Sequence, residues 1–187
     1  FQYIGTNGAG KTTNMRIPLY YYNPSGKRKD HAIETSKDAF NTFYFRGEYS
    51  FIIFEVCRGL NEDGTPDLYH VAVYRHRTIV PTFLFIDAPY DLEFYRNSSG
   101  YLCNAVDLIQ RLNREGIRSE PVKLYERFKE VIYGLNKSKE MAPFVFAQPR
   151  PHAISAMRTI PGILSSIFRA EAMKTGTLKE ALIASLG

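Results

Sequence analysis

Nine residues near the start of the sequence constrain the fold more than any other stretch, because they specify a loop between a strand and a helix. They read Gly5-Thr6-Asn7-Gly8-Ala9-Gly10-Lys11-Thr12-Thr13 and fit the spacing G-x-x-x-x-G-K-[ST]. Glycine lets the backbone adopt positive φ and approach an anion without a Cβ in the way. The flanking residues agree, since 1–4 read as the end of a strand and 12–19 as the beginning of a helix. The sequence therefore predicts a phosphate-binding loop.

The residue types in this loop also predict its ligands. Backbone N–H groups of successive residues and the positive end of the following helix bind phosphate oxygens. Lys11 is expected at the β- and γ-phosphates, and the Thr12 hydroxyl at Mg²⁺. The nucleotide-binding set is Asn7, Gly8, Ala9, Gly10, Lys11, Thr12 and Thr13. The alternative is a glycine turn with an incidental lysine. Such spacing arises by chance in roughly one per cent of chains of this length, so the pattern favours binding of ATP with Mg²⁺.

Composition restricts the class of protein. The chain has 187 residues, 44% hydrophobic and 23% charged, which suits a globular domain with a real core. Its net charge of +5 permits a polyanionic partner without requiring one. The two cysteines, Cys57 and Cys103, show no metal or disulfide spacing, which favours a cytoplasmic location. No apolar run reaches membrane-spanning length, so no membrane partner is expected. The sequence begins inside a predicted strand without Met, which suggests a cut N-terminus.

The middle of the chain predicts an antiparallel meander. Residues 48–57 and 68–75 are β-like runs, separated by the turn residues 61–65, and this is a hairpin pattern. Residues 82–87 predict a third strand after Pro81. Phosphate-binding loops usually lie on parallel sheets, so two types of sheet are expected in one mixed α/β fold.

The second half of the chain is predicted to be mainly helical. Residues 105–114 have helical spacing, and a second helix is expected to start at Ser119 and Pro121 and to end at Gly134. Residues 142–148 predict a short strand, 160–169 a short helix, and 177–180 a capping box that begins another helix.

Two basic clusters are candidate contacts for a nucleic-acid backbone. The first is Lys27, Arg28 and Lys29 in a predicted loop, and the second is Arg111, Arg114 and Arg118 along one helix face. Arginine and lysine bind DNA phosphates without reading sequence. Clusters of this kind are more often solvated surface, and contact with a nucleic-acid backbone is the alternative that the sequence leaves open.

The motifs together resemble one family. GTNGAGKTT is similar to the G-x-N-G-A/S-G-K-[ST]-[ST] loop of ABC-type and SMC (structural maintenance of chromosomes) ATPase heads. SFIIFEVCRG and the meander after it look like the strands that follow this loop. IPGILSSIFRAEAMKTGTLKEALIASL resembles the segment that enters the coiled-coil arm of MukB-like SMC proteins, including the SMC-like subunit of Wadjet plasmid-defence systems. The resemblance spans most of the chain, but only the loop matches residue by residue.

The resemblance implies a function and its partners. Residues 1–187 would be the N-terminal lobe of an SMC/ABC-type head with a P-loop NTPase fold, without the coiled-coil arm and the C-terminal lobe. No catalytic residue is expected in this chain, because that lobe and a second head complete the ATPase. Gln148 would be the Q-loop glutamine and, with Thr12, a ligand of Mg²⁺. The implied partners are a second head in a homodimer, kleisin-type and accessory subunits, and double-stranded DNA. The implied role is nucleoid-associated chromosome organisation or defence against plasmid DNA.

A competing interpretation makes the chain a self-contained P-loop kinase or NTPase. Residues 82–87 form an apolar run ending in Asp87, as in a Walker B strand that holds Mg²⁺. Arg96 or Arg111 would then contact phosphate. Two features oppose this interpretation: no crossover helix separates the strand from the preceding hairpin, and no catalytic Glu follows Asp87. A third interpretation treats the loop as a purely structural nucleotide site.

Overall fold

The computed structural model describes residues 17–18, 20–24, 44–75 and 80–145. The chain divides into two compact units, one formed by Phe1–Phe40 with Pro151–Gly187 and the other by Asn41–Arg150. In the first unit, the described residues are helical at 17–18 and 20–22, and a bend follows at Asn23. The second unit contains all the elements described below.

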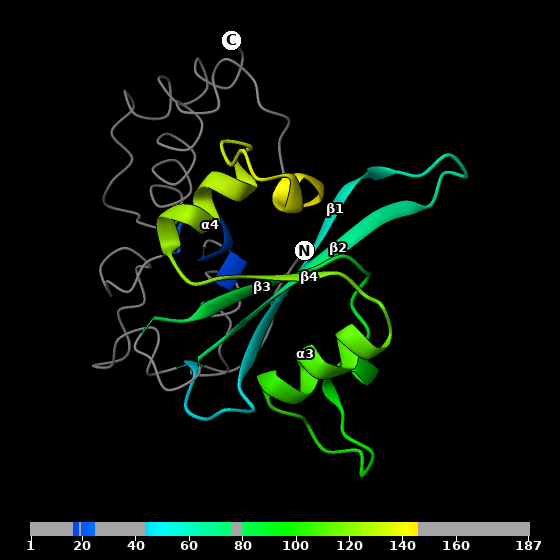
Figure 1. Cartoon of the computed structure of the whole chain (residues 1–187), viewed down its shortest axis with the longest axis vertical. Coiled ribbons are helices and arrows are strands. Elements are labelled where there is room, and N and C mark those ends of the chain that lie inside the picture. Colours follow the sequence, from blue (N-terminus) through cyan, green and yellow to red (C-terminus); the bar gives the residue numbers. More distant parts are fainter. Residues whose placement is uncertain (1–16, 19, 25–43, 76–79, 146–187) are drawn as a thin grey trace, which may run out of the picture. The chain divides into compact units, whose positions relative to one another are not determined.

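The second unit is built on a four-stranded antiparallel sheet. Its strands are β1 (Phe51–Leu60), β2 (Pro66–Tyr74), β3 (Thr82–Ile86) and β4 (Ser119–Val122), in the spatial order β1-β2-β3-β4. Every neighbouring pair is antiparallel. The predicted meander is therefore confirmed, and Figure 1 shows that its first two strands form a hairpin extending beyond the others. The structure is a mixed α/β fold.

The β1–β2 hairpin closes through the turn that the sequence predicts. The Asn61 N–H donates to the Thr65 carbonyl at 2.8 Å, and Gly64 adopts φ 82°, which only glycine takes without strain. The Asp63 carboxylate accepts from the Thr65 N–H at 2.9 Å. The start of β1 was predicted too early, because Glu48 and Tyr49 lie in a turn closed by the bond from the Ser50 N–H to the Gly47 carbonyl at 3.1 Å.

Two α-helices and two 3-10 helices complete the unit. They are η2 (Leu92–Tyr95), α3 (Ala105–Arg114), α4 (Tyr125–Ile132) and η3 (Lys139–Phe144). The bounds of α3 match the prediction, because Asn104 caps its first turn and Gly116, at φ 70°, follows its end. Gly134, at φ 71°, likewise follows α4. Among the described residues, no helix is long and apolar enough to cross a bilayer.

Two predicted elements are wrong. Residues 119–122 form strand β4 and not the first turn of a helix, so α4 begins only at Tyr125. Pro121 is tolerated there because β4 is an edge strand of the described sheet, where a missing N–H breaks no ladder bond on the solvent side. Residues 142–144, predicted as the start of a strand, close the 3-10 helix η3. Residues 119–145 are consequently less helical than the sequence predicts, and the elements predicted at 160–169 and 177–180 lie outside the described residues.

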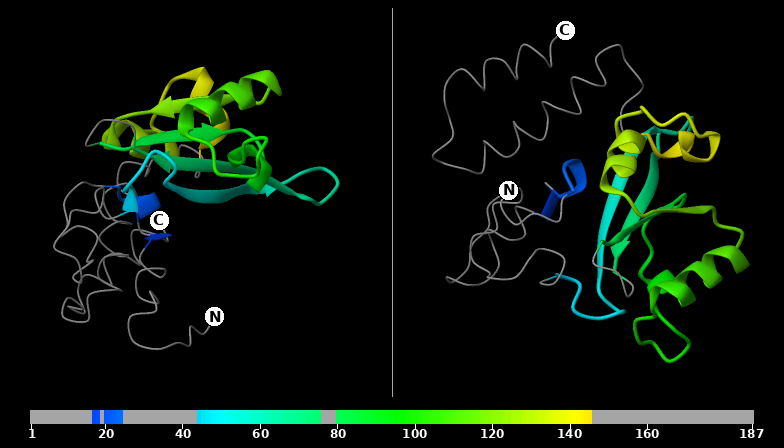
Figure 2. Two further views of the ribbon diagram at one scale, coloured as in Figure 1. Left: turned by 90° about the horizontal axis from the view of Figure 1, so that it is seen from below. Right: turned by 60° about the vertical axis from the view of Figure 1, so that its left-hand side comes forward.

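Successive side chains of each strand point to opposite faces of the sheet, so the core has two parts, here called the α3 face and the α4 face. The α3 face carries Ala72, Tyr74, Leu84 and Ile86, which pack against Leu108 and Leu112 of α3. The α4 face carries Tyr69, Phe83 and Phe85, whose rings contact Phe128 of α4 and Phe144 of η3. Figures 1 and 2 show α3 and α4 on opposite sides of the sheet, as the odd and even positions of β3 require.

Candidate functional site

Most of the predicted site residues lie outside the described residues. These are the phosphate-loop residues Asn7, Gly8, Ala9, Gly10, Lys11, Thr12 and Thr13, the basic cluster Lys27, Arg28 and Lys29, and Gln148. Their assignment to ATP, Mg²⁺ and DNA stays a prediction from the sequence. The described candidates are Asp87 and the arginines of the α3 region, and these can be placed in detail.

Asp87 follows β3 directly and is held by an arginine from another strand. Its N–H donates to the Arg118 carbonyl at 2.9 Å, which extends the β3–β4 ladder by one bond. Its Oδ1 accepts from Nη1 of Arg58 at 2.9 Å, and both side chains are mostly buried. Arg58 also binds Asp67 at 2.6 Å through Nη2. The carboxylate therefore already has a charged partner within the sheet.

Arg58 lies on the α4 face of the sheet, as alternation along β1 from Val56, the partner of Tyr69, requires. The β1–β2 register shifts beside it, between Cys57 and Gly59. There its guanidinium lies 5.5 Å from the centre of the Tyr69 ring and donates to the Pro143 carbonyl at 2.9 Å. Burial lowers the pKa of Arg58, but hydrogen bonds and charge attraction from Asp67 and Asp87 outweigh it and raise the pKa. The guanidinium is a permanent cation in this cluster.

In the described residues Asp87 takes part in an ion pair of the sheet, and its role as a magnesium ligand stays a prediction. Mg²⁺ requires carboxylate oxygens in near-ideal octahedral geometry, whereas Asp87 presents Oδ1 to a cation at 2.9 Å. Within the described part of the chain, no group of three or more His, Cys, Asp or Glu side chains could hold a metal. The strand before Asp87 is also antiparallel to both its neighbours. These contacts favour a structural role for Asp87.

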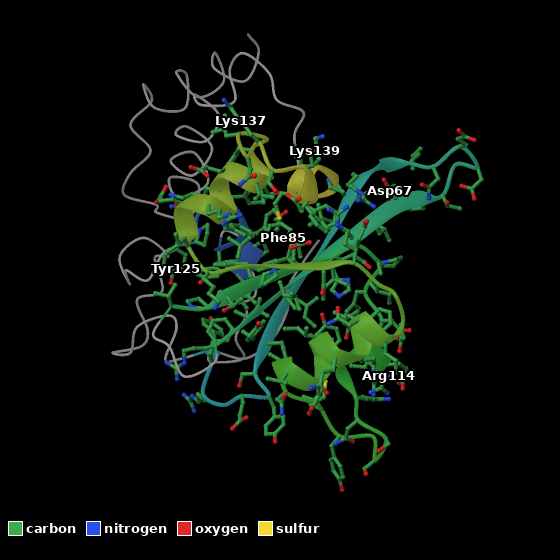
Figure 3. The ribbon with its side chains drawn as sticks, in the orientation of Figure 1. Asp67, Phe85, Arg114, Tyr125, Lys137 and Lys139 are labelled. Atoms are coloured by element: carbon green, nitrogen blue, oxygen red, sulfur yellow. The ribbon has the colours of Figure 1, made fainter. Side chains whose placement is uncertain are left out.

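The three arginines predicted to share a face are used differently. Nη1 of Arg111 donates to the Glu93 carbonyl, and Nη2 of Arg118 donates to the Glu140 carbonyl at 2.6 Å. Arg118 lies after the end of α3, in the residues that lead into β4. Arg114 is exposed in the last turn of α3, next to Glu115 (Figure 3). Two of the three guanidinium groups thus serve the fold.

The charge of the chain is distributed unevenly between the two units. Residues 41–150 contain 14 Lys and Arg and 14 Asp and Glu, so they are neutral. The other unit contains the remaining 10 basic and 5 acidic residues of the totals 24 and 19, and it accounts for the whole net charge of +5. The phosphate loop and Lys27, Arg28 and Lys29 belong to the basic unit. Charge alone therefore favours that unit for polyanion binding.

A buried polar cluster on the α3 face was not predicted from the sequence. His70 is fully buried, and its Nδ1 donates to the Ala88 carbonyl at 2.7 Å, which leaves Nε2 as an acceptor. Neither Nε2 of His70 nor the buried hydroxyl of Tyr95 has a hydrogen-bond partner, and their rings lie 6.0 Å apart. Burial lowers the pKa of His70, although the Ala88 carbonyl and Glu55 oppose the shift. His70 is therefore a neutral core residue near pH 7.

The described residues define a mixed α/β protein with a four-stranded antiparallel sheet flanked by helices. The chain belongs to the family described as "Protein of unknown function (DUF3584)", whose model matches residues 1–186. Comparison with curated proteins and with solved structures gave no match.

Proposed function

We propose that this chain is the ATP-binding half of an SMC-like ATPase head that dimerises on ATP and acts on DNA. The observation that carries the proposal is the residue-by-residue match of residues 5–13 to a phosphate-binding loop. Asn7, Gly8, Ala9 and Gly10 would present backbone N–H groups to the phosphates. Lys11 would neutralise the β- and γ-phosphates, and Thr12 would bind Mg²⁺.

Two further observations support the proposal. An antiparallel sheet follows the loop in the chain, as the resemblance to ABC-type and SMC heads implies. The apolar run ending in Asp87, which would make the chain a complete NTPase, ends in a carboxylate already paired with Arg58. In this proposal the catalytic carboxylate comes from the C-terminal lobe, and a second head completes the site for hydrolysis. ATP would then join two heads, and hydrolysis would release them.

The proposed partners follow from charge and resemblance. A homodimer of heads, kleisin-type and accessory subunits, and double-stranded DNA are expected, in chromosome organisation or plasmid defence. The basic unit would supply phosphate contacts through Lys27, Arg28 and Lys29, whereas Arg111 and Arg118 are engaged within the fold. Backbone contacts of this kind make DNA affinity fall steeply with salt.

The proposal is tested by nucleotide binding with and without Mg²⁺. We expect the 187-residue chain to bind ATP in calorimetry, Lys11→Ala to abolish binding, and Thr12→Ala to remove the dependence on Mg²⁺. Lys37→Ala, outside the loop, is the matched control and should bind normally. Binding that survives Lys11→Ala would refute the proposal. ATP turnover by the isolated chain that Asp87→Asn abolishes would support a self-contained phosphotransferase.

A further inference from the structure

The connection between β3 and α3 carries most of the large apolar side chains that the described residues expose to solvent. Residues 90–106 are about a sixth of the described chain, yet they hold five of its nine exposed large apolar side chains. Single exposed apolar residues are common on protein surfaces, whereas a concentration of them indicates a binding surface. The five residues, here called the connection patch, are Tyr90, Leu92, Tyr101, Leu102 and Val106.

The core on this side of the sheet is formed by other residues of the same stretch. Tyr95, Cys103 and Ala105 are buried beside α3. Leu102 lies opposite Arg96 in a β-bridge, and neighbouring positions of an extended chain point to opposite sides, so Leu102 points away from the buried positions next to it. Val106 is exposed on α3, whose buried positions begin at Ala105 and continue at Leu108 and Leu112. The apolar character of the connection patch therefore contributes little to the core.

Backbone hydrogen bonds fix the shape of the connection before any partner binds. The Asn97 N–H donates to the Tyr101 carbonyl at 2.7 Å, and Oδ1 of Asn97 accepts from the N–H groups of Ser99 and Tyr101, both at 3.0 Å. The Cys103 N–H donates to the Tyr95 carbonyl at 2.8 Å. Figures 1 and 2 show the loop between η2 and α3 extending beyond both elements. A surface that is already ordered loses less conformational entropy on binding.

The charges that accompany the connection patch are mainly acidic. Residues 88–110 contain Asp91, Glu93 and Asp107 and one basic residue, Arg96, so their net charge is −2, whereas the whole chain has +5. Arg96 is paired with Glu93 at 3.0 Å, so it adds no free positive charge to this surface. Apolar side chains among unbalanced carboxylates are complementary to a partner that combines apolar and basic side chains.

We propose that the connection patch binds an apolar and basic segment of a partner protein. Tyr101 and Leu102 contact apolar side chains of that segment, and Asp107 attracts its Lys or Arg residues. Tyr101 is the most exposed member of the patch, at 72%, and tyrosine is enriched among the residues that dominate binding energy. The patch contains no residue of the phosphate loop, so this inference goes beyond the proposed ATP-binding function and does not rest on it.

The test uses a displayed library of random short peptides, selected for binding to the 187-residue chain. Calorimetry then compares the affinity of the selected peptides for the wild type and for variants that remain folded by circular dichroism. Tyr101→Ser and Leu102→Ser each remove an apolar side chain of the patch, and Asp107→Asn removes one charge. The matched controls are Leu124→Ser and Glu62→Gln, because both of these residues are exposed and lie outside residues 88–110.

We expect the selected peptides to be enriched in Lys or Arg together with large apolar residues, and to bind more weakly as the salt concentration rises. The dissociation constant should increase by about 10-fold for Tyr101→Ser and Leu102→Ser. It should increase by about 3-fold for Asp107→Asn, because an exposed charge contributes less. Both controls should bind as the wild type does.

Three results would overturn the proposal. The first is a library that yields no binding peptide, or only peptides without an excess of basic residues. The second is binding that Tyr101→Ser and Leu102→Ser leave unchanged. The third comes from sedimentation of the chain alone: a dimer that Leu102→Ser dissociates would make a second copy of this chain, and not a basic partner, the occupant of the patch.

Discussion

Both faces of the sheet bury apolar side chains, but they hold polar atoms differently. On the α4 face, the hydroxyl of Tyr69 and the guanidinium of Arg58 both donate to carbonyls of η3. On the α3 face, Nε2 of His70 and the hydroxyl of Tyr95 are buried without hydrogen-bond partners. An unpaired buried polar atom costs roughly 1–3 kcal/mol relative to water. Nε of Arg58 on the α4 face is also buried without a partner. The faces therefore differ in what their donors hold: the α4 face fixes two consecutive carbonyls of η3, and the α3 face fixes the Ala88 carbonyl through His70.

The two faces also differ in the side chains that pack at their centres. The α4 face is a connected set of aromatic rings: Phe83 and Phe128 are stacked at 4.2 Å between centres, and Phe85 contacts Phe128 and Phe144. The α3 face is aliphatic where it meets Leu108 and Leu112, and aromatic where Phe51, Tyr74 and Tyr95 make ring contacts. Aromatic pairs contribute about 0.5–1.5 kcal/mol beyond the area that they bury. Truncation of a central ring on the α4 face should therefore cost more than truncation of a leucine that α3 contributes to the α3 face.

The largest expected effect is the truncation of Phe85. We expect Phe85→Ala to lower the free energy of unfolding by about 3–5 kcal/mol, because it leaves a cavity and removes ring contacts to Tyr69, Phe128 and Phe144. Leu108→Ala on the α3 face is the matched comparison, and it should lower the free energy of unfolding by less, about 3 kcal/mol. Urea denaturation followed by circular dichroism measures both. An equal or larger loss for Leu108→Ala would contradict the proposed difference between the faces.

The sequence predicted the parts of this fold that depend on local signals. Helix α3 has an Asn cap, helical spacing and a following glycine, and its bounds were predicted correctly. The β1–β2 turn has its Asp63 and Gly64 signal. Strand β4 was missed because its four residues include Pro121 and owe their conformation to pairing with β3, more than thirty positions earlier. Local propensity carries no information about that pairing.

The candidate site also has a part that local sequence reveals and a part that depends on contacts between distant residues. The phosphate loop is visible in the sequence because its chemistry lies in nine consecutive residues. Arg58 gave no signal, because its partners Asp67 and Asp87 lie 9 and 29 residues away and meet it only through the register of the sheet. Asp87 therefore resembled a free metal ligand in the sequence. The contacts of the Arg111–Arg118 stripe gave no signal for a similar reason, since the carbonyls that hold two of its members belong to Glu93 and Glu140.

The next effect concerns the pH dependence of the α3 face. Burial lowers the pKa of His70 in the folded state, whereas the pKa of a histidine in the unfolded chain is about 6.5. Below that pH the unfolded chain therefore binds more protons than the folded chain. The contribution of His70 to the free energy of unfolding is complete above that pH, and it falls as the pH decreases toward the pKa of His70 in the folded state. Within that window the loss is at most about 1.4 kcal/mol per pH unit. Denaturation midpoints at pH 8, 7, 6 and 5 measure it.

His70→Asn is the matched variant for this titration. The asparagine amide can still donate to the Ala88 carbonyl, which His70 Nδ1 does at 2.7 Å, but it does not titrate. We expect this variant to be less stable at pH 8 and to lose the part of the pH dependence that His70 contributes. A wild-type and a variant profile with the same slope between pH 7 and 5 would show that His70 is not protonated on unfolding, and would remove this distinction between the faces.

The smallest expected effects come from removing one tyrosine hydroxyl on each face. The same substitution should lower the free energy of unfolding on the α4 face and raise it on the α3 face. Tyr69 and Tyr95 are both fully buried, but only the Tyr69 hydroxyl has a carbonyl acceptor, at 3.0 Å. Tyr69→Phe leaves the Phe144 carbonyl without this donor and should destabilise the protein by about 1 kcal/mol. Tyr95→Phe removes a buried hydroxyl that has lost its hydrogen bonds to water without gaining one in the protein, and it should stabilise the protein by about 1 kcal/mol.

Both tyrosine variants keep the ring, so packing changes little and the difference in unfolding free energy reports the hydroxyl alone. Urea denaturation at pH 8, where His70 is neutral in both states, separates this effect from the titration. Destabilisation by Tyr95→Phe would mean that a bound water joins its hydroxyl to Nε2 of His70, a complementary donor and acceptor in one cluster. In that case the buried polar atoms of His70 and Tyr95 would be paired through water, and the contrast between the hydroxyls of Tyr69 and Tyr95 would be lost.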